Sequence, residues 1–149
     1  RDYSVIANGR NPIVAHEFLG GNNDGRDVII IDDMISSGGS MLDTARQLKE
    51  MGAKRVFICT TFGLFTDGME AFDAAYEKGW FDRVITTNLT YQIPELLARP
   101  YYIEADMSKF LASIIDFMNH DVSLTNVLTP TEKIRTILEK YNNREEYNI

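Results

Sequence analysis

The sequence predicts an α/β fold: a three-layer, doubly wound and mainly parallel sheet flanked by helices. The first observation is the apolar, β-branched run Val28–Ile31, which lies between turn signals and suits a strand buried on both faces. The second is the helical pattern of Met41–Met51, and the third is the next apolar run, Arg55–Thr60. Because the order is strand, helix, strand, we expect a right-handed parallel crossover.

The same alternation continues along the chain. Further strands are expected at Arg83–Thr87 and Tyr101–Glu104, and helical segments at Met69–Lys78, Pro94–Leu97, Asp106–Asn119 and Thr131–Tyr141. The helix Asp106–Asn119 has an apolar side that should face the core. This side consists of Met107, Phe110, Leu111, Ile114, Ile115 and Met118.

Three helix starts carry residues that are typical caps. Ser40 and Asp43 resemble a capping box at the start of the first helix. Asp106 is the expected N-cap of the fourth helical segment. Either Thr129 or Thr131 should cap the last helix, next to a proline.

A chain of 149 residues is long enough for one domain with a substantial core. We expect a single domain over residues 1–149, with an irregular lead-in over residues 1–24 and a frayed tail over 142–149. Because the first residue is Arg1 and not Met, we expect the chain to have been cut from a longer protein.

The composition excludes several functional classes. The net charge of −7 without a basic stripe argues against a nucleic-acid surface, and no run of about 18 apolar residues suits a membrane span. The single Cys59 cannot form an internal disulfide, and with the distant His16 and His120 it forms no zinc cluster. We expect Cys59 to be a core residue in a reducing, cytoplasmic compartment.

The segment after the first strand has the chemistry of an anion cradle. Its members combine hydroxyl donors with glycines: Ser36, Ser37, Gly38, Gly39 and Ser40. Glycines let backbone N–H groups approach a ligand, and the positive end of the following helix favours a phosphate. Neither G-x-x-x-x-G-K-[ST] nor G-x-G-x-x-G is present, so a standard nucleotide fingerprint does not explain the segment.

Two adjacent carboxylates, Asp32 and Asp33, precede this cradle at the expected carboxyl end of the strand. In parallel sheets ligands bind at this end. Carboxylates at such a position can accept hydrogen bonds from a sugar diol or share a divalent cation. The structural alternative is a solvated strand end and a turn, with Ser40 as an ordinary helix cap. We favour a site for a phosphorylated sugar, because the acidic pair and the cradle occur in this order.

The residues V-I-I-I-D-D-M-I-S-S-G-G-S (28–40) resemble the phosphoribosyl-pyrophosphate loop of type I phosphoribosyltransferases and ribose-phosphate pyrophosphokinases. Four later segments are similar to the C-terminal half of ribose-phosphate pyrophosphokinase: M-L-D-T-A-R-Q-L-K-E-M-G-A-K-R-V-F, T-T-F-G-L-F, R-V-I-T-T-N and D-M-S-K-F-L-A-S-I-I. The resemblance covers most of Asp27–Leu128 and implies a phosphoribosyltransferase-like fold. Residues 1–23 and the last helix look like an extended variant.

The resemblance implies roles for individual residues. Asp32 and Asp33 would bind the ribose 2- and 3-hydroxyls and a ribose-bound Mg²⁺, while the cradle residues would hold the 5-phosphate. Arg1 would be the last basic residue of a catalytic loop. Three positions depart from the family: Ser36 replaces an acidic residue that is a general base in some transferases, Phe62 replaces His, and Leu128 replaces a frequent Phe. The stretch Ser123–Leu128 corresponds to part of an inhibitory nucleotide or phosphate site in some members.

The activity implied is that of a ribose-phosphate pyrophosphokinase. This transferase moves a pyrophosphoryl group from MgATP to ribose 5-phosphate, releases AMP and works as a homo-oligomer, a dimer or a hexamer. The catalytic Lys and the metal-binding His and Asp of the family would lie in a missing N-terminal half, so this chain alone should bind ribose 5-phosphate or phosphate weakly and make no product. Two alternatives stay open: a phosphoribosyltransferase, and a non-catalytic phosphoribosyl-binding regulatory subunit.

Overall fold

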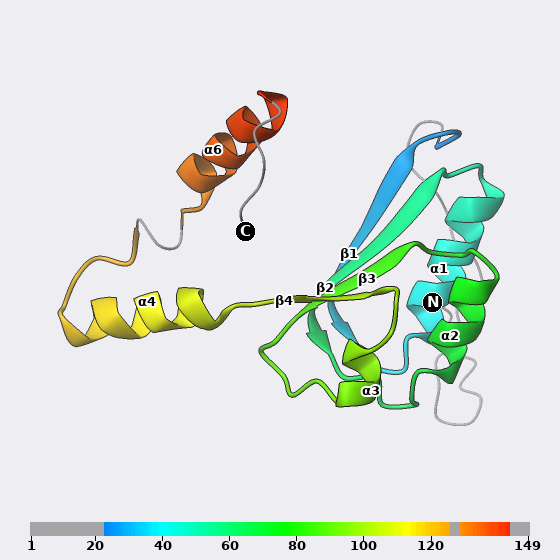
Figure 1. Ribbon diagram of the computed structural model, residues 1–149, viewed down its shortest axis with the longest axis horizontal. Helices are drawn as coiled ribbons and strands as arrows, with labels where there is room; N and C mark the ends of the chain where they lie inside the picture. Colours follow the sequence, from blue (N-terminus) through cyan, green and yellow to red (C-terminus); the bar gives the residue numbers. More distant parts are fainter. Residues whose placement is uncertain (1–22, 126–128, 144–149) are drawn as a thin grey trace, which may run out of the picture. The chain divides into compact units, whose positions relative to one another are not determined.

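Four parallel strands form the sheet of the computed structural model, which describes residues 23–125 and 129–143 (Figure 1). They are β1 (Asp27–Ile35), β2 (Arg55–Gly63), β3 (Arg83–Thr87) and β4 (Tyr102–Ala105). The strands lie side by side in sequence order, and each pair is parallel. The predicted α/β class, with a parallel sheet flanked by helices, is therefore confirmed.

Helices connect the strands and continue beyond the last one. Their bounds are Gly39–Glu50 for α1, Glu70–Glu77 for α2, Pro94–Leu97 for α3, Ser108–Asn119 for α4 and Thr131–Asn142 for α6. Each expected strand and helix between residues 27 and 142 is present. The clearest difference is that β1 continues to Ile35, four residues past the apolar run, so that both aspartates lie within the strand and not after it.

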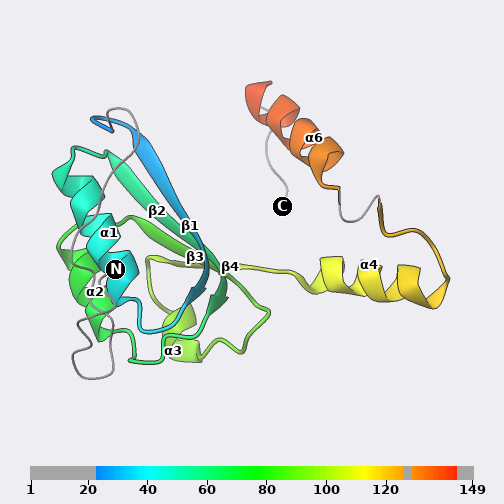
Figure 2. The same ribbon diagram turned by 180° about the vertical axis from the view of Figure 1, so that it is seen from behind.

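The helices α1 and α2 lie on the same side of the sheet in both views (Figures 1 and 2). Successive strand residues point to opposite faces, so the buried ones mark the face beneath these helices. The main buried residues of this layer are Ala45 and Leu48 of α1, Phe72 and Ala75 of α2, and Val56, Ile58, Val84 and Tyr102 of the sheet.

The other face of the sheet is open, as far as residues 23–106 describe it. Ile29 is 60% exposed and Ile31 81% exposed on β1. The prediction that this strand is buried on both faces is therefore wrong for the described residues. Strands in sequence order, joined by crossovers of one hand, place α1 and α2 on one side only.

The chain divides into two compact units, Arg1–Asp106 and Met107–Ile149, where the sequence predicts one domain over residues 1–149. The second unit contains α4 and α6. Within it, no residue of either helix is buried, so the apolar side of α4 does not form a core in the way the sequence predicts. No helix among the described residues is long and apolar enough to cross a membrane.

The three predicted helix caps are wrong. The helix α1 begins after Gly38, so Ser40 lies inside the first turn, and Asp43 accepts hydrogen bonds from Arg46 and Gln47 instead of completing a capping box. The helix α4 begins after Met107, while Asp106 accepts a hydrogen bond from Asn88 Nδ2 at 2.9 Å.

At α6 the N-cap position is Pro130, without a side-chain cap from Thr129 or Thr131. At α1 and α4 a side chain expected in the cap has another partner: Asp43 accepts from Arg46 and Asp106 from Asn88.

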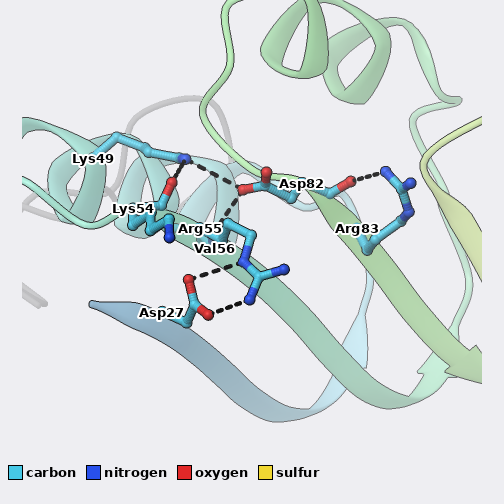
Figure 3. A network of polar contacts seen from close by, with 7 residues as sticks. All are labelled: Asp27, Lys49, Lys54, Arg55, Val56, Asp82 and Arg83. Atoms are coloured by element: carbon cyan, nitrogen blue, oxygen red, sulfur yellow. Dashed lines mark hydrogen bonds and ion pairs between the residues drawn. The ribbon is translucent and has the colours of Figure 1, made fainter. Parts of the chain in front are cut away.

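A polar network fastens the amino ends of the first three strands (Figure 3). Asp82 Oδ2, just before β3, accepts hydrogen bonds from Val56 N at 2.9 Å and from Lys49 Nζ at 3.2 Å. At the start of β1 and β2, Arg55 forms a two-pronged ion pair with Asp27. Because the strands are parallel, fixing their amino ends leaves the opposite edge of the sheet for the loops that form the candidate site.

Candidate functional site

A pocket of about 250 Å³ lies where β1 passes into α1, at the carboxyl end of the strand. It is lined by Asp32, Met34, Ile35, Ser36, Ser37, Gly38, Gly39, Ser40 and Met41. All five cradle residues proposed from the sequence thus line one pocket, together with one of the two aspartates.

Gly38, one of the lining residues, has an unusual backbone conformation. Its φ of 81° is left-handed, a conformation that residues with a side chain rarely adopt. A Cβ atom added at Gly38 would also lie 2.3 Å from Cε2 of Phe72. In contrast, nothing lies within 4 Å of a Cβ atom added at Gly39. Gly38 is therefore required by the fold, whereas Gly39 leaves open space beside the pocket.

The helix α1 contributes its amino end to the pocket wall. Gly38 O accepts hydrogen bonds from Met41 N at 3.1 Å and from Leu42 N at 2.9 Å, which closes the first turn. The early N–H groups of a helix carry its positive dipole end. No lysine, arginine or histidine is among the described lining residues. The attraction for an anion would thus come from backbone N–H groups and serine hydroxyls.

The two aspartates of β1 differ in their relation to the pocket. Asp32, which pairs with Thr60 of β2, lines the pocket, whereas Asp33 is not among the described residues that line it. Both carboxylates are exposed, and each accepts a hydrogen bond from the following backbone N–H, at 2.9 Å for Asp32 and 2.8 Å for Asp33. The structure therefore joins Asp32 to the cradle and does not join Asp33 to it.

The structure also brings in a residue that sequence reasoning passed over. Thr66 lies in the loop between β2 and α2, and its N–H donates to Ser36 O at 3.0 Å. The side-chain oxygens of Ser36 and Thr66 are 3.5 Å apart. The signal for this contact was present, because carboxyl ends of neighbouring parallel strands meet at one edge. Thr66 follows the second strand just as Ser36 follows the first.

Several residues named from the sequence lie away from this pocket or outside the described part. Arg1, His16 and Leu128 lie outside the described residues. Phe62 is half-buried in β2 and pairs with Met34 of β1. Cys59 is partly buried, and this burial raises the pKa of its thiol. No group of three or more metal-ligating side chains occurs among the described residues.

Together these features define a class: a parallel α/β domain with a polar, glycine-lined pocket at its first strand-to-helix junction. A family model described as "Phosphoribosyl synthetase-associated domain" matches residues 6–129. The chain belongs to this family, which confirms the resemblance to ribose-phosphate pyrophosphokinases. The helix α6 lies beyond the matched region.

Curated relatives and a solved structure agree with this assignment. The ribose-phosphate pyrophosphokinase of Pasteurella multocida is 35% identical over 105 residues, which cover 70% of this chain and 32% of the relative. That of Pyrococcus abyssi is 48% identical over 44 residues, which cover 30% of this chain and 15% of the relative. The crystal structure of phosphoribosylpyrophosphate synthetase from Mycobacterium smegmatis matches with a TM-score of 0.60 and 25% identity, over 68% of this chain and 33% of the other. The chain thus spans about a third of the length of its more broadly matched relatives.

Proposed function

We propose that this chain is the ribose 5-phosphate-binding part of a ribose-phosphate pyrophosphokinase. The observation that carries the proposal is the pocket at the β1–α1 junction, in a chain of this family. Its volume of about 250 Å³ is small compared with sites for drug-sized ligands, which suits a sugar phosphate. The ligand would enter with its phosphate toward α1 and its sugar toward the carboxyl end of β1.

The phosphate end of the ligand would be held mainly by the backbone. Ser36 and Ser40 are exposed and Ser37 is half-buried, so hydroxyl donors are available around the pocket. The α1 amino end adds a favourable dipole for a dianion. The open space beside Gly39 would let the phosphate approach the backbone closely, which a side chain at this position would prevent.

The sugar end of the ligand would be held by Asp32. A carboxylate next to a phosphate site repels the anion unless it has a different partner, and ribose hydroxyls are suitable donors to it. Asp32 also fits a Mg²⁺ ion, which usually takes one or two carboxylates and completes its shell with substrate oxygens and water. Such an ion, when bound, would neutralise charge between the carboxylate and the ligand.

The proposed reaction of the longer protein is pyrophosphoryl transfer from MgATP. The anomeric oxygen of ribose 5-phosphate forms a bond to the β-phosphorus, the bond from that phosphorus to the α,β-bridging oxygen breaks, and AMP leaves. Such transfers depend on positioning and on stabilising negative charge. The part of the reaction that this chain would perform is to hold and orient the acceptor sugar. ATP binding, a homo-oligomeric dimer or hexamer and a cytoplasmic location belong to the same proposal.

Calorimetry on the 149-residue chain tests the proposed ligand. We expect ribose 5-phosphate to bind more tightly than either ribose or inorganic phosphate, since the pocket would engage both ends of the molecule. Adenine and AMP serve as controls for a nucleotide site. If a nucleobase binds more tightly than ribose 5-phosphate, the chain is a better candidate for a phosphoribosyltransferase.

A non-catalytic, phosphoribosyl-binding subunit remains the second candidate because Ser36 stands at the position of an acidic residue. Its hydroxyl cannot act as a general base near neutral pH. An assay of the longer protein with ATP and ribose 5-phosphate distinguishes the two candidate functions by whether AMP is released. Release supports the pyrophosphokinase, whereas tight ribose 5-phosphate binding without release supports the regulatory subunit.

A further inference from the structure

The loop between β2 and α2 is fastened to the end of β1 at two successive points. Leu64 N donates to Ile35 O at 2.8 Å, and Thr66 N donates to Ser36 O at 3.0 Å. These bonds join the strand end and the first cradle residue to a loop about thirty residues away in sequence. The backbone position of Ser36 therefore depends on the conformation of this second loop.

Phe65, between the two donors, has a φ of 45°, which is uncommon for a residue with a large side chain. Its ring is buried, with 8% exposed, and meets the rings of Phe72 at 5.1 Å and Tyr102 at 6.3 Å, both edge to face. A strained backbone of this kind persists only when surrounding packing imposes it. The packing of the buried Phe65 ring accounts for the strained backbone next to Thr66.

Phe72, which packs against Phe65, also contacts the cradle at Gly38. Phe72 lies against Gly38, so closely that a Cβ atom at Gly38 would collide with its ring. Ser36 is bonded to Thr66, the neighbour of Phe65, and Gly38 lies against Phe72. The rings of Phe65 and Phe72 pack against each other. The two ends of the cradle therefore contact the β2–α2 loop and the first turn of α2.

The side chain of Thr66 extends this connection by a chain of hydroxyl contacts. Ser36 Oγ lies 3.5 Å from Thr66 Oγ1, and Thr66 Oγ1 donates to Asp67 Oδ1 at 3.4 Å. With the Thr66 proton directed at Asp67, the Thr66 oxygen accepts from Ser36. Thr66 thus contacts Ser36 at both its carbonyl oxygen and its hydroxyl, and the backbone bond is the shorter of the two contacts.

We propose that Thr66 is a positioning residue of the β1–α1 pocket, which orders Ser36 and the adjoining cradle for an anionic ligand. Thr66 is not among the described residues that line the pocket, so it acts through Ser36. The identity of the ligand rests on the proposed function, whereas the ordering of Ser36 can be measured without a ligand.

The test compares Thr66→Val, which keeps the shape but removes the hydroxyl, with Thr66→Ser, which keeps the hydroxyl. Nuclear magnetic resonance relaxation of the ligand-free chain gives the backbone order parameters of Ser36 and Ser37. We expect about 0.85 in the wild type and in Thr66→Ser, and about 0.75 or lower in Thr66→Val. Thr136→Val is the control, because the Thr136 hydroxyl donates to Glu132 O within its own helix.

Binding of ribose 5-phosphate provides the second measurement. We expect Thr66→Val to weaken it about threefold to tenfold, with less than about a twofold change in Thr66→Ser and Thr136→Val. Unchanged order parameters in Thr66→Val, or a loss that Thr66→Ser does not rescue, would overturn the positioning role. If the wild type does not bind the sugar phosphate, the proposed function fails, and the order parameters still decide the role of Thr66.

Discussion

The ring of Phe72 occupies the space that a side chain at Gly38 would need: a Cβ atom there would lie 2.3 Å from Cε2 and 2.4 Å from Cζ. Phe72 is fully buried in α2, so its ring cannot move into solvent to make room. A core aromatic residue and a pocket glycine are therefore matched to each other, and the next glycine along the chain has no such partner.

This relationship predicts different effects on stability for substitutions at two neighbouring glycines. Gly38→Ala should lower the free energy of unfolding by about 1–3 kcal/mol, through left-handed strain and overpacking. Gly39→Ala should change it by less than about 0.5 kcal/mol, because its methyl group meets open space. The same Gly39→Ala protein should lose affinity for ribose 5-phosphate. Urea unfolding and calorimetry measure the two effects, and equal destabilisation by both substitutions would contradict the prediction.

The two aspartates of β1 should differ in their effect on the ligand. Asp32 lines the pocket, so Asp32→Asn should weaken ribose 5-phosphate binding about tenfold or more, the range for losing a hydrogen bond to a charged group. Asp33→Asn should weaken it less than about twofold, since Asp33 does not line the pocket. Calorimetric titration of both proteins checks this. An equal loss in both would mean that the two carboxylates reach the sugar together, as the family resemblance implies.

A buried hydroxyl pair should contribute clearly to stability. Thr86 is 0% exposed, and its hydroxyl lies 2.6 Å from Tyr102 OH. Tyr102→Phe leaves the Thr86 hydroxyl without its closest partner and should cost about 1–3 kcal/mol. In the double variant with Thr86→Val, most of this loss should be recovered, because both polar groups are gone. Urea unfolding of the single and double variants provides the comparison, and no recovery would argue against the pair.

Asp73 should give the protein a stability that depends on pH. Hydrogen bonds from Arg99, joined by one from Tyr101 OH at 2.7 Å, lower the pKa of the Asp73 carboxyl. The unfolded pKa is about 3.9, so the stabilisation is fully present above that value and is lost as pH falls below it. Wild type and Asp73→Asn should differ in unfolding free energy at pH 7 and converge toward pH 3. A difference that stays constant over this range would contradict the assignment.

Two carboxylates in the network at the amino ends of the strands should contribute differently to stability, because Asp82 is half-buried and Asp27 is exposed. Asp82→Ala removes the partner of Val56 N, in a residue that is 0% exposed, and should cost about 1–3 kcal/mol. Asp27→Ala breaks the exposed pair with Arg55 and should cost less, because surface ion pairs contribute little. Thermal unfolding of both variants tests this order. A larger loss in Asp27→Ala would mean that its pair with Arg55 is the main fastening.

The sequence by itself determined the order of the elements between residues 27 and 142. Arg83–Thr87 and Pro94–Leu97 were predicted at the observed bounds, and the family resemblance of residues 28–40 was confirmed. Such features depend on local properties, namely apolar periodicity, turn residues and short motifs, which can be read from neighbouring residues. The grouping of the serines and glycines in one pocket followed from the same local order.

Only the tertiary structure decided which residue caps α1, which aspartate joins the pocket and which loop holds the cradle. Gly38 precedes the helix in a left-handed turn over Phe72, although Ser40 has the better capping side chain. The strand β1 extends through both aspartates, and Asp32 lines the pocket whereas Asp33 does not. Thr66 meets Ser36 because two parallel strands end side by side. Each result depends on contacts between residues about thirty positions apart, and local propensity carries no information about them.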